Sequence, residues 1–139
     1  MESKIIPTKK VGNTNRRKGF NAERFYAQCF RDLGYPFCKT TRESSRLLDS
    51  CKIDLNFLPV LVQIKAGKQK NFNPSKILFE MEENLKTNFP PEEAVHSKPK
   101  IVIHHKQGVS GKKRNEFDTL VIMSFETFKQ FLKNYDRTI

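Results

Sequence analysis

Residues 52–65 read KIDLNFLPVLVQIK, and they place three polar side chains in the most apolar stretch of the chain. The stretch predicts two strands joined by a tight turn, with Asp54 in the first strand and Gln63 and Lys65 closing the second. Because side chains alternate between the two faces of a strand, Gln63 and Lys65 should project together. Burying charge is costly, so this placement indicates either a pairing or a chemical role.

The hydrophobic periodicity of the whole chain predicts a single-domain α/β protein, with helices flanking a central mixed sheet. The expected order is α-β-β-β-α-β-β-α: a helix at 18–33, strands at 36–41, 53–57 and 60–65, a helix at 74–89, strands at 100–105 and 119–123, and a helix that Ser124 begins. Residues 43–52 read as a loop with some helical character. A helix between two strands implies a right-handed crossover, so strands 60–65 and 100–105 should pair in parallel.

The net charge of +11 favours binding to a polyanion, chiefly nucleic acid. The alternative is a solvated surface, but the basic residues cluster, notably at 16–18, 65–70 and 112–114. Residues 1–16 read as a flexible basic arm, followed by one domain at 17–139. We find no basic amphipathic helix of the kind that binds a membrane surface. The longest apolar run is too short to span a bilayer.

The three cysteines, Cys29, Cys38 and Cys51, have no CxxC spacing. They predict neither a disulfide framework nor a zinc site, and they fit a reducing cytosol. The twelve phenylalanines fall mostly on helix stripes, including that of the last helix, and are expected in the core. Phe72, among basic residues, is a candidate contact or dimer residue.

Glu23 occupies an unexpected place in the first predicted helix. At helical spacing it falls in the middle of the apolar stripe, between Phe20 and Ala27. A carboxylate that faces the core needs a base, several hydrogen-bond donors or a metal ion.

Glu23, Asp54, Gln63 and Lys65 are thus the polar residues that the pattern turns inward. Carboxylate and amide oxygens are hard ligands suited to Mg²⁺ or Mn²⁺, which can polarise a phosphodiester and activate a water. A neighbouring lysine can orient that water and offset negative charge. The alternatives are structural: an Asp54–Lys65 ion pair, a half-exposed Gln63, and Glu23 paired with a nearby arginine, either Arg42 or Arg46.

The order of these residues resembles the PD-(D/E)xK nuclease superfamily and, within it, the archaeal-type Holliday junction resolvases. The resemblance begins at RRKGFNAERFYAQCFRDLGY (16–35), continues through ESS (43–45), and reaches IDL (53–55) and VQIK (62–65). It implies a restriction-endonuclease-like fold, and a cytoplasmic protein of a bacterium, an archaeon or a virus-infected cell. It also implies a homodimer that places paired nicks across a four-way DNA junction, with no small-molecule substrate.

The resemblance implies a role for each matching residue. Glu23, Asp54, Gln63 and the main-chain carbonyl of Ile64 would hold one or two Mg²⁺ ions, with Mn²⁺ as a substitute, and Lys65 would be the catalytic lysine. Ser44, or else Ser45, would lie near the scissile phosphate. The residues expected to bind DNA are Arg17, Lys18, Arg24, Arg42, Arg46, Lys68, Lys112, Lys113 and Arg114. The last three could equally form a solvated loop.

The chain departs from the family pattern at two positions. Gln63 stands where the family usually has Glu, which keeps an oxygen ligand but removes a charge, so metal affinity should fall. Ile53 stands where Pro often precedes the catalytic acid. Asp49 is a competing metal ligand, but it lacks the apolar strand around Asp54. Other nucleases of this fold (restriction, repair or virus-type) and a non-catalytic nucleic-acid-binding protein remain alternatives.

His104 and His105 are adjacent on a predicted strand and should point to opposite faces. They therefore cannot bind one metal ion together, and we expect strand-end residues rather than catalytic ones.

Overall fold

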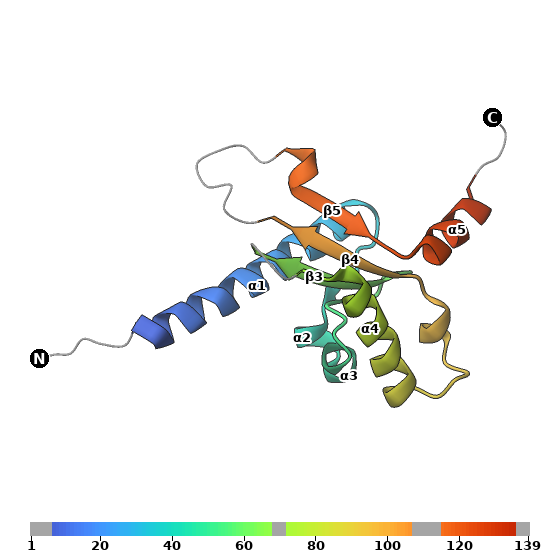
Figure 1. Ribbon diagram of the computed structural model, residues 1–139, viewed down its shortest axis with the longest axis horizontal. Coiled ribbons are helices and arrows are strands. Elements are labelled where there is room, and N and C mark those ends of the chain that lie inside the picture. Colours follow the sequence, from blue (N-terminus) through green and yellow to red (C-terminus); the bar gives the residue numbers. More distant parts are fainter. Residues whose placement is uncertain (1–6, 68–71, 107–114, 136–139) are drawn as a thin grey trace, which may run out of the picture.

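The computed structural model describes residues 7–67, 72–106 and 115–135, with the main chain alone for 7–16 and Lys18. It has the α/β character predicted from the sequence (Figure 1). The elements in chain order are α1 (Pro7–Asp32), β1 (Lys39–Thr40), α2 (Thr41–Ser44), α3 (Arg46–Ser50), β2 (Leu55–Asn56), β3 (Leu61–Ala66), α4 (Pro74–Asn88), η1 (Ala94–Ser97), β4 (Lys100–His105), η2 (Glu116–Asp118), β5 (Thr119–Ile122) and α5 (Phe125–Lys133).

The main sheet has the order β3-β4-β5 and is mixed. β3 and β4 pair in parallel, with Leu61 opposite Lys100, and β5 runs antiparallel to β4. The predicted parallel pairing across α4 is therefore confirmed. β1 and β2 form a separate antiparallel pair rather than joining the main sheet. A hydrogen bond of 2.7 Å from the Asp54 N–H to the Val62 carbonyl connects this pair to β3.

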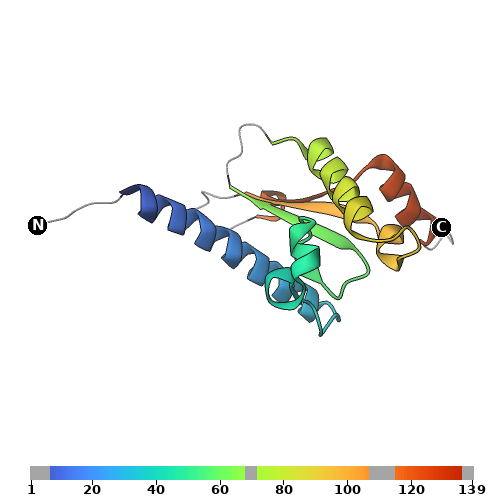
Figure 2. The ribbon, with the colours of Figure 1, turned by 90° about the horizontal axis from the view of Figure 1, so that it is seen from below.

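Helices cover both faces of the main sheet (Figure 2). One buried cluster joins α1 to the sheet through Tyr26, Val62 and Ile64. A second cluster joins α4 to the other face through Leu61 and Leu85. This layering decides which side of β3 each polar side chain can reach.

α1 is longer than the sequence predicts. It begins at Pro7 rather than Lys18, so residues 7–16, which we expected in a flexible arm, belong to the helix. Proline is compatible with the first helical turn, because its missing N–H has no partner there. The buried stripe also ends earlier than predicted, since Ala27 is 2% exposed and Leu33 is 73% exposed.

The strands at 36–41 and 53–57 are shorter than predicted, with only two residues each. Pro36 has no N–H for a ladder, and the chain enters α2 directly after Thr40. Phe57 has a φ of 64°, which ends β2. The helical character expected at 43–52 is present as α2 and α3.

α4 begins as predicted, with the Asn73 side chain accepting the Lys76 N–H at 3.2 Å and Pro74 in the first turn. In contrast, the expected burial of the phenylalanines is wrong for most of them, although Phe30 and Phe89 are partly buried against the two core clusters. All twelve lie in the described part of the chain, and none is buried.

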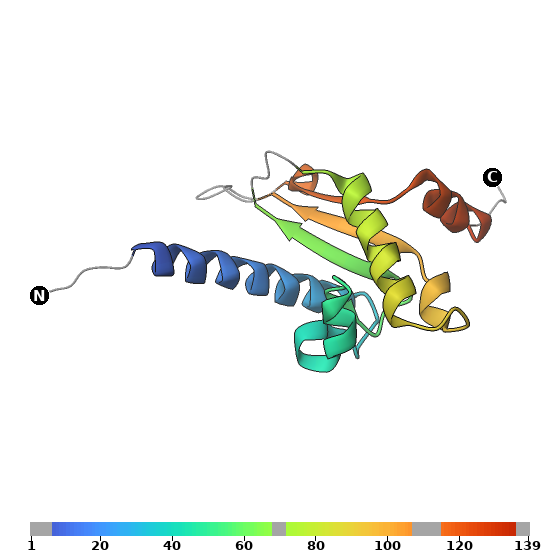
Figure 3. The ribbon, with the colours of Figure 1, turned by 60° about the horizontal axis from the view of Figure 1, so that its bottom comes forward.

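α5 shows why hydrophobic periodicity could not decide which phenylalanines are buried. Its apolar stripe, Phe125, Phe128, Leu132 and Tyr135, is between 46% and 71% exposed. Its polar residues Glu126, Thr127 and Gln130 instead line a groove together with residues of α4. The α5 ribbon follows β5 and lies at the opposite end of the molecule from the start of α1 (Figure 3). Within the described ranges, no helix is both long enough and apolar enough to cross a membrane.

Candidate active site

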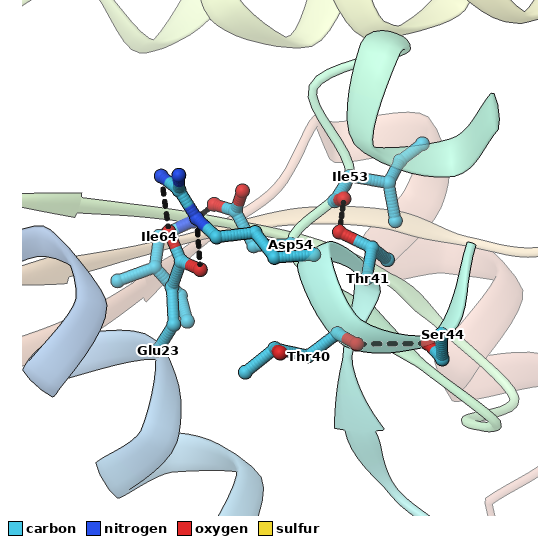
Figure 4. Close-up of polar contacts among 8 residues, drawn as sticks. Glu23, Thr40, Thr41, Ser44, Ile53, Asp54 and Ile64 are labelled. Carbon is cyan, nitrogen blue, oxygen red and sulfur yellow. Dashed lines mark hydrogen bonds and ion pairs between the residues drawn. The ribbon is translucent and has the colours of Figure 1, made fainter. Parts of the chain in front are cut away.

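Glu23 points inward from α1 and is paired with an arginine. Its side chain is 7% exposed. The Arg42 guanidinium donates from Nε to Oε1 at 2.9 Å and from Nη2 to Oε2 at 3.2 Å, as the dashed lines at Glu23 mark (Figure 4). The same guanidinium lies 4.2 Å from the centre of the Phe20 ring. The inward direction is as predicted, and the pairing with Arg42 is one of the structural alternatives.

Asp54 is fixed in place between two segments of the chain. Its main-chain N–H bonds to Val62 at 2.7 Å, and its main-chain carbonyl accepts the Thr41 N–H at 2.9 Å. Its carboxylate oxygen Oδ2 accepts the Ile64 N–H at 2.7 Å. Thr41 adds a hydroxyl bond of 2.6 Å to the carbonyl of Ile53. These bonds hold the carboxylate at the edge of β3.

The main-chain carbonyl of Ile64 shares that edge. In an extended strand the N–H and C=O of one residue point to the same side. Since the Ile64 N–H is directed at Asp54, the Ile64 carbonyl faces the same edge. A carboxylate and a carbonyl oxygen therefore lie on one side of β3.

The surroundings of Asp54 disfavour its charge. Burial raises the pKa of Asp54 from 3.8 to about 7, and the charge of Glu23 adds to the increase. The Ile64 N–H, Arg42 and Lys65 act in the opposite direction. Two acids and two bases are thus close enough to influence one another, and a cation at Asp54 would stabilise its ionised form.

Gln63 and Lys65 leave β3 on the side that faces α4. Val62 and Ile64 pack in the α1 cluster and Leu61 packs in the α4 cluster, so alternation sends Gln63 with Leu61. Gln63 is 7% exposed. Among the described residues, its amide makes no side-chain hydrogen bond. The structure therefore brings Glu23, Arg42 and Asp54 together but does not bring Gln63 into contact with either acid.

The donor set suits a hard cation. In the described part of the chain, no three Asp, Glu, His or Cys side chains form a group that could hold a metal ion. Two carboxylates, the Gln63 amide and the Ile64 carbonyl are nevertheless hard oxygen ligands, which Mg²⁺ accepts together with waters. Because Arg42 occupies both oxygens of Glu23, these residues fit one ion at Asp54 better than two.

The two serines of the ESS segment (43–45) do not point into the site formed by Glu23 and Asp54. Ser44 Oγ donates to the Thr40 carbonyl at 2.8 Å and accepts from Asn56 at 3.1 Å. In Figure 4, Ser44 lies on the far side of Thr41 from Glu23. Ser45 accepts the Leu48 N–H at 3.2 Å and caps α3. Both hydroxyls stabilise local structure in this arrangement.

The competing acid, Asp49, lies on α3. It acts electrostatically on Arg42, so it belongs to the surroundings of the Glu23–Arg42 pair.

The predicted DNA-binding residues fall into three groups. Arg17, Arg24 and Arg46 are exposed and available. Arg42 is engaged by Glu23, which also raises its pKa through the hydrogen bonds. The others lie outside the described side chains: Lys18, Lys68, Lys112, Lys113 and Arg114.

His104, which we expected to be a strand-end residue rather than a catalytic one, is a neighbour of the site. It lies opposite Lys65 in the β3–β4 register, and its ring stacks on Phe72 at 4.3 Å. Its Nε2 atom is buried and has no hydrogen-bond partner within the part of the chain that the structure describes. The strand register of 60–65 with 100–105 could have indicated the proximity to Lys65, but not the stacking.

Comparison of the chain with models of protein families, with curated proteins and with solved structures finds no match, so its function must be argued from this geometry.

Proposed function

We propose that the protein is a metal-dependent, structure-selective DNA endonuclease of the PD-(D/E)xK kind, a Holliday junction resolvase that nicks four-way junctions. The observation that carries the proposal is the position of Asp54. A carboxylate with a raised pKa is fixed at the edge of β3, near an inward-facing Glu23 and the amine of Lys65. Perturbed acids beside a base are typical of functional sites.

Each residue has a role in this proposal. Asp54 and the Ile64 carbonyl would hold the ion, and Glu23 would complete or support its shell. Gln63, on the face of β3 toward α4, would act on the ion through a bound water. Mg²⁺, when bound, supplies Lewis-acid activation of the phosphodiester and the attacking water. The Lys65 ammonium offsets the negative charge that develops on the phosphate. Arg42 positions Glu23, and its partly exposed guanidinium can also approach a phosphate.

The charge and the surface support branched DNA as the substrate. A net charge of +11 attracts the phosphate backbone. A four-way junction has a two-fold axis, which suits a homodimer with one site in each subunit. The exposed apolar stripe of α5, which follows the edge strand β5 in the chain, is the surface that we assign to the second copy.

Cleavage of synthetic substrates tests this proposal. The parent protein should place symmetric nicks in a four-way junction with Mg²⁺, whereas Asp54→Asn and Lys65→Ala should reduce the rate at least about 100-fold. Flaps, nicked duplex and linear duplex in parallel reactions distinguish a resolvase from a restriction, repair or virus-type nuclease. Absence of nicking by the folded parent in both Mg²⁺ and Mn²⁺ would reject the catalytic proposal.

The second candidate is a nucleic-acid-binding protein without catalysis. The Glu23–Arg42 pair favours it, because an acid that accepts two hydrogen bonds from a guanidinium needs no metal. Such a protein would bind junctions without nicking them, and Mn²⁺ would not raise its melting temperature.

A further inference from the structure

A second site lies near the end of the sheet at which β3 and β4 begin. Tyr35, Phe37 and Phe57, here called the aromatic cradle, line a cavity of about 710 Å³ together with Leu58 and Pro59. This volume is typical of ligand pockets. The three rings are 40%, 76% and 54% exposed, respectively. Large rings left open around a cavity need an explanation that packing does not provide.

The backbone that presents Phe57 is strained. Its φ of 64° lies in the left-handed region, which costs a bulky residue on the order of 1–2 kcal/mol. A turn alone would be served by Gly or Asn. Since the ring is 54% exposed, burial of the ring does not offset the cost. Strain of this kind is found at functional sites.

A chain of hydrogen bonds stabilises this conformation. The Phe57 N–H donates to Oδ1 of Asn56 at 2.8 Å. The Asn56 amide donates in turn to Ser44 Oγ at 3.1 Å, and Ser44 donates to the Thr40 carbonyl. The main chain at Phe57 is therefore held in position by α2 and β1, and Ser44 acquires a role away from the candidate active site.

The charge around the cradle indicates its ligand. Lys39 and Lys98 line the cavity beside the rings, and among the described residues no acidic side chain lines it. Aromatic faces beside ammonium groups match a nucleotide, whose base stacks and whose phosphate is anionic. An apolar peptide would use the rings but not the lysines.

We propose that the aromatic cradle binds an unpaired base of a nucleic acid, stacked on Phe37 or Phe57, while Lys39 and Lys98 contact the flanking phosphates. The base comes either from a single strand or from the branch point of a junction, since bases within a duplex are already stacked. The inference rests on the DNA binding in the proposed function but is independent of its chemistry.

Fluorescence of 2-aminopurine tests the inference. The probes are a single strand carrying this base, its duplex, and a four-way junction with the base at the branch. Phe57→Asn removes the ring and keeps a residue that tolerates the left-handed φ, so it should fold. We expect its affinity for the single strand to fall about 5- to 150-fold, with duplex affinity nearly unchanged. If only the junction responds, the base comes from the branch point.

Matched variants keep the test decisive. Phe37→Ala should also weaken binding of the single strand, whereas Phe79→Ala, which removes a 62% exposed ring from α4, should not. Unchanged affinity for every probe in Phe57→Asn overturns the inference, as does an effect of this variant on self-association alone. A parent that nicks junctions while Phe57→Asn binds normally refutes the cradle alone. If the parent binds the base but does not nick junctions, and Phe57→Asn weakens that binding, the nuclease alone is refuted.

Discussion

At the scale of single residues, Asp54 combines good hydrogen bonding with an unfavourable charge. In the unfolded chain the Asp54 carboxyl group loses its proton near pH 4, whereas in the folded protein burial raises its pKa to about 7. A folded state that binds the proton more tightly loses stability as the pH rises. The cost of ionised Asp54 should therefore appear between about pH 4 and pH 7 and remain in full above it.

Asp54→Asn removes that cost and keeps an acceptor for the Ile64 N–H. In EDTA at pH 8 its free energy of unfolding should exceed that of the parent by up to about 4 kcal/mol, and the difference should vanish near pH 4. Urea unfolding at several pH values measures this. Parallel stability profiles for the two proteins would contradict the raised pKa. Adding Mg²⁺ at pH 8 should raise the melting temperature of the parent only.

Gln63→Glu tests the ligand assignment at the same scale. A carboxylate binds Mg²⁺ more strongly than an amide, so cleavage at low Mg²⁺ should be retained or improved. In EDTA the variant should be less stable than the parent, because residue 63 is 7% exposed and the variant buries an additional carboxylate there. Gln63→Leu, similar in size but without the oxygen, should require more Mg²⁺. Loss of activity in Gln63→Glu, with the fold intact, would remove Gln63 from the ligand set.

At the scale of elements, α4 and α5 differ in the burial of their apolar residues. Met81 and Leu85 of α4 are 0% exposed and belong to the cluster on one face of the sheet. α5 has an equally clear apolar periodicity, but its stripe faces outward. The stability of the fold therefore depends on α4 far more than on the apolar residues of α5.

Leu85→Ala should lower the free energy of unfolding by about 2–5 kcal/mol, because it leaves a cavity in a closed cluster. Phe79→Ala on the same helix should change it by no more than about 0.5 kcal/mol, since that ring is 62% exposed. Urea unfolding compares the two variants directly. Similar losses would mean that the exposed side of α4 is covered in solution.

At the scale of the whole molecule, β5 and α5 both leave apolar side chains exposed. Leu120 and Val121 are 47% and 53% exposed at the last strand of the sheet, and the α5 stripe follows directly in the chain. An open strand edge and an uncovered helix stripe are suited to pairing with a second copy across a two-fold axis.

Leu132→Asp should therefore convert a dimer into a monomer, because it places a charge in the centre of the apolar stripe. Sedimentation at micromolar concentrations measures the change. Gln130→Asp on the polar side of α5 is the matched control and should leave the dimer intact. A parent that is monomeric at every concentration would exclude this surface as a homodimer interface.

The sequence by itself determined the alternation of helices and strands, the parallel pairing across α4, the caps at Asn73 and Ser124, and the inward direction of Glu23. These follow from hydrophobic period and capping chemistry, which act over a few residues. Only the tertiary structure decided what Glu23 meets, because Arg42 reaches it from another element. The same is true of Ser44, whose hydroxyl bonds to Asn56 rather than entering the site, and of the exposed stripe of α5. Periodicity states that a helix has an apolar face, but the rest of the chain determines whether that face is covered.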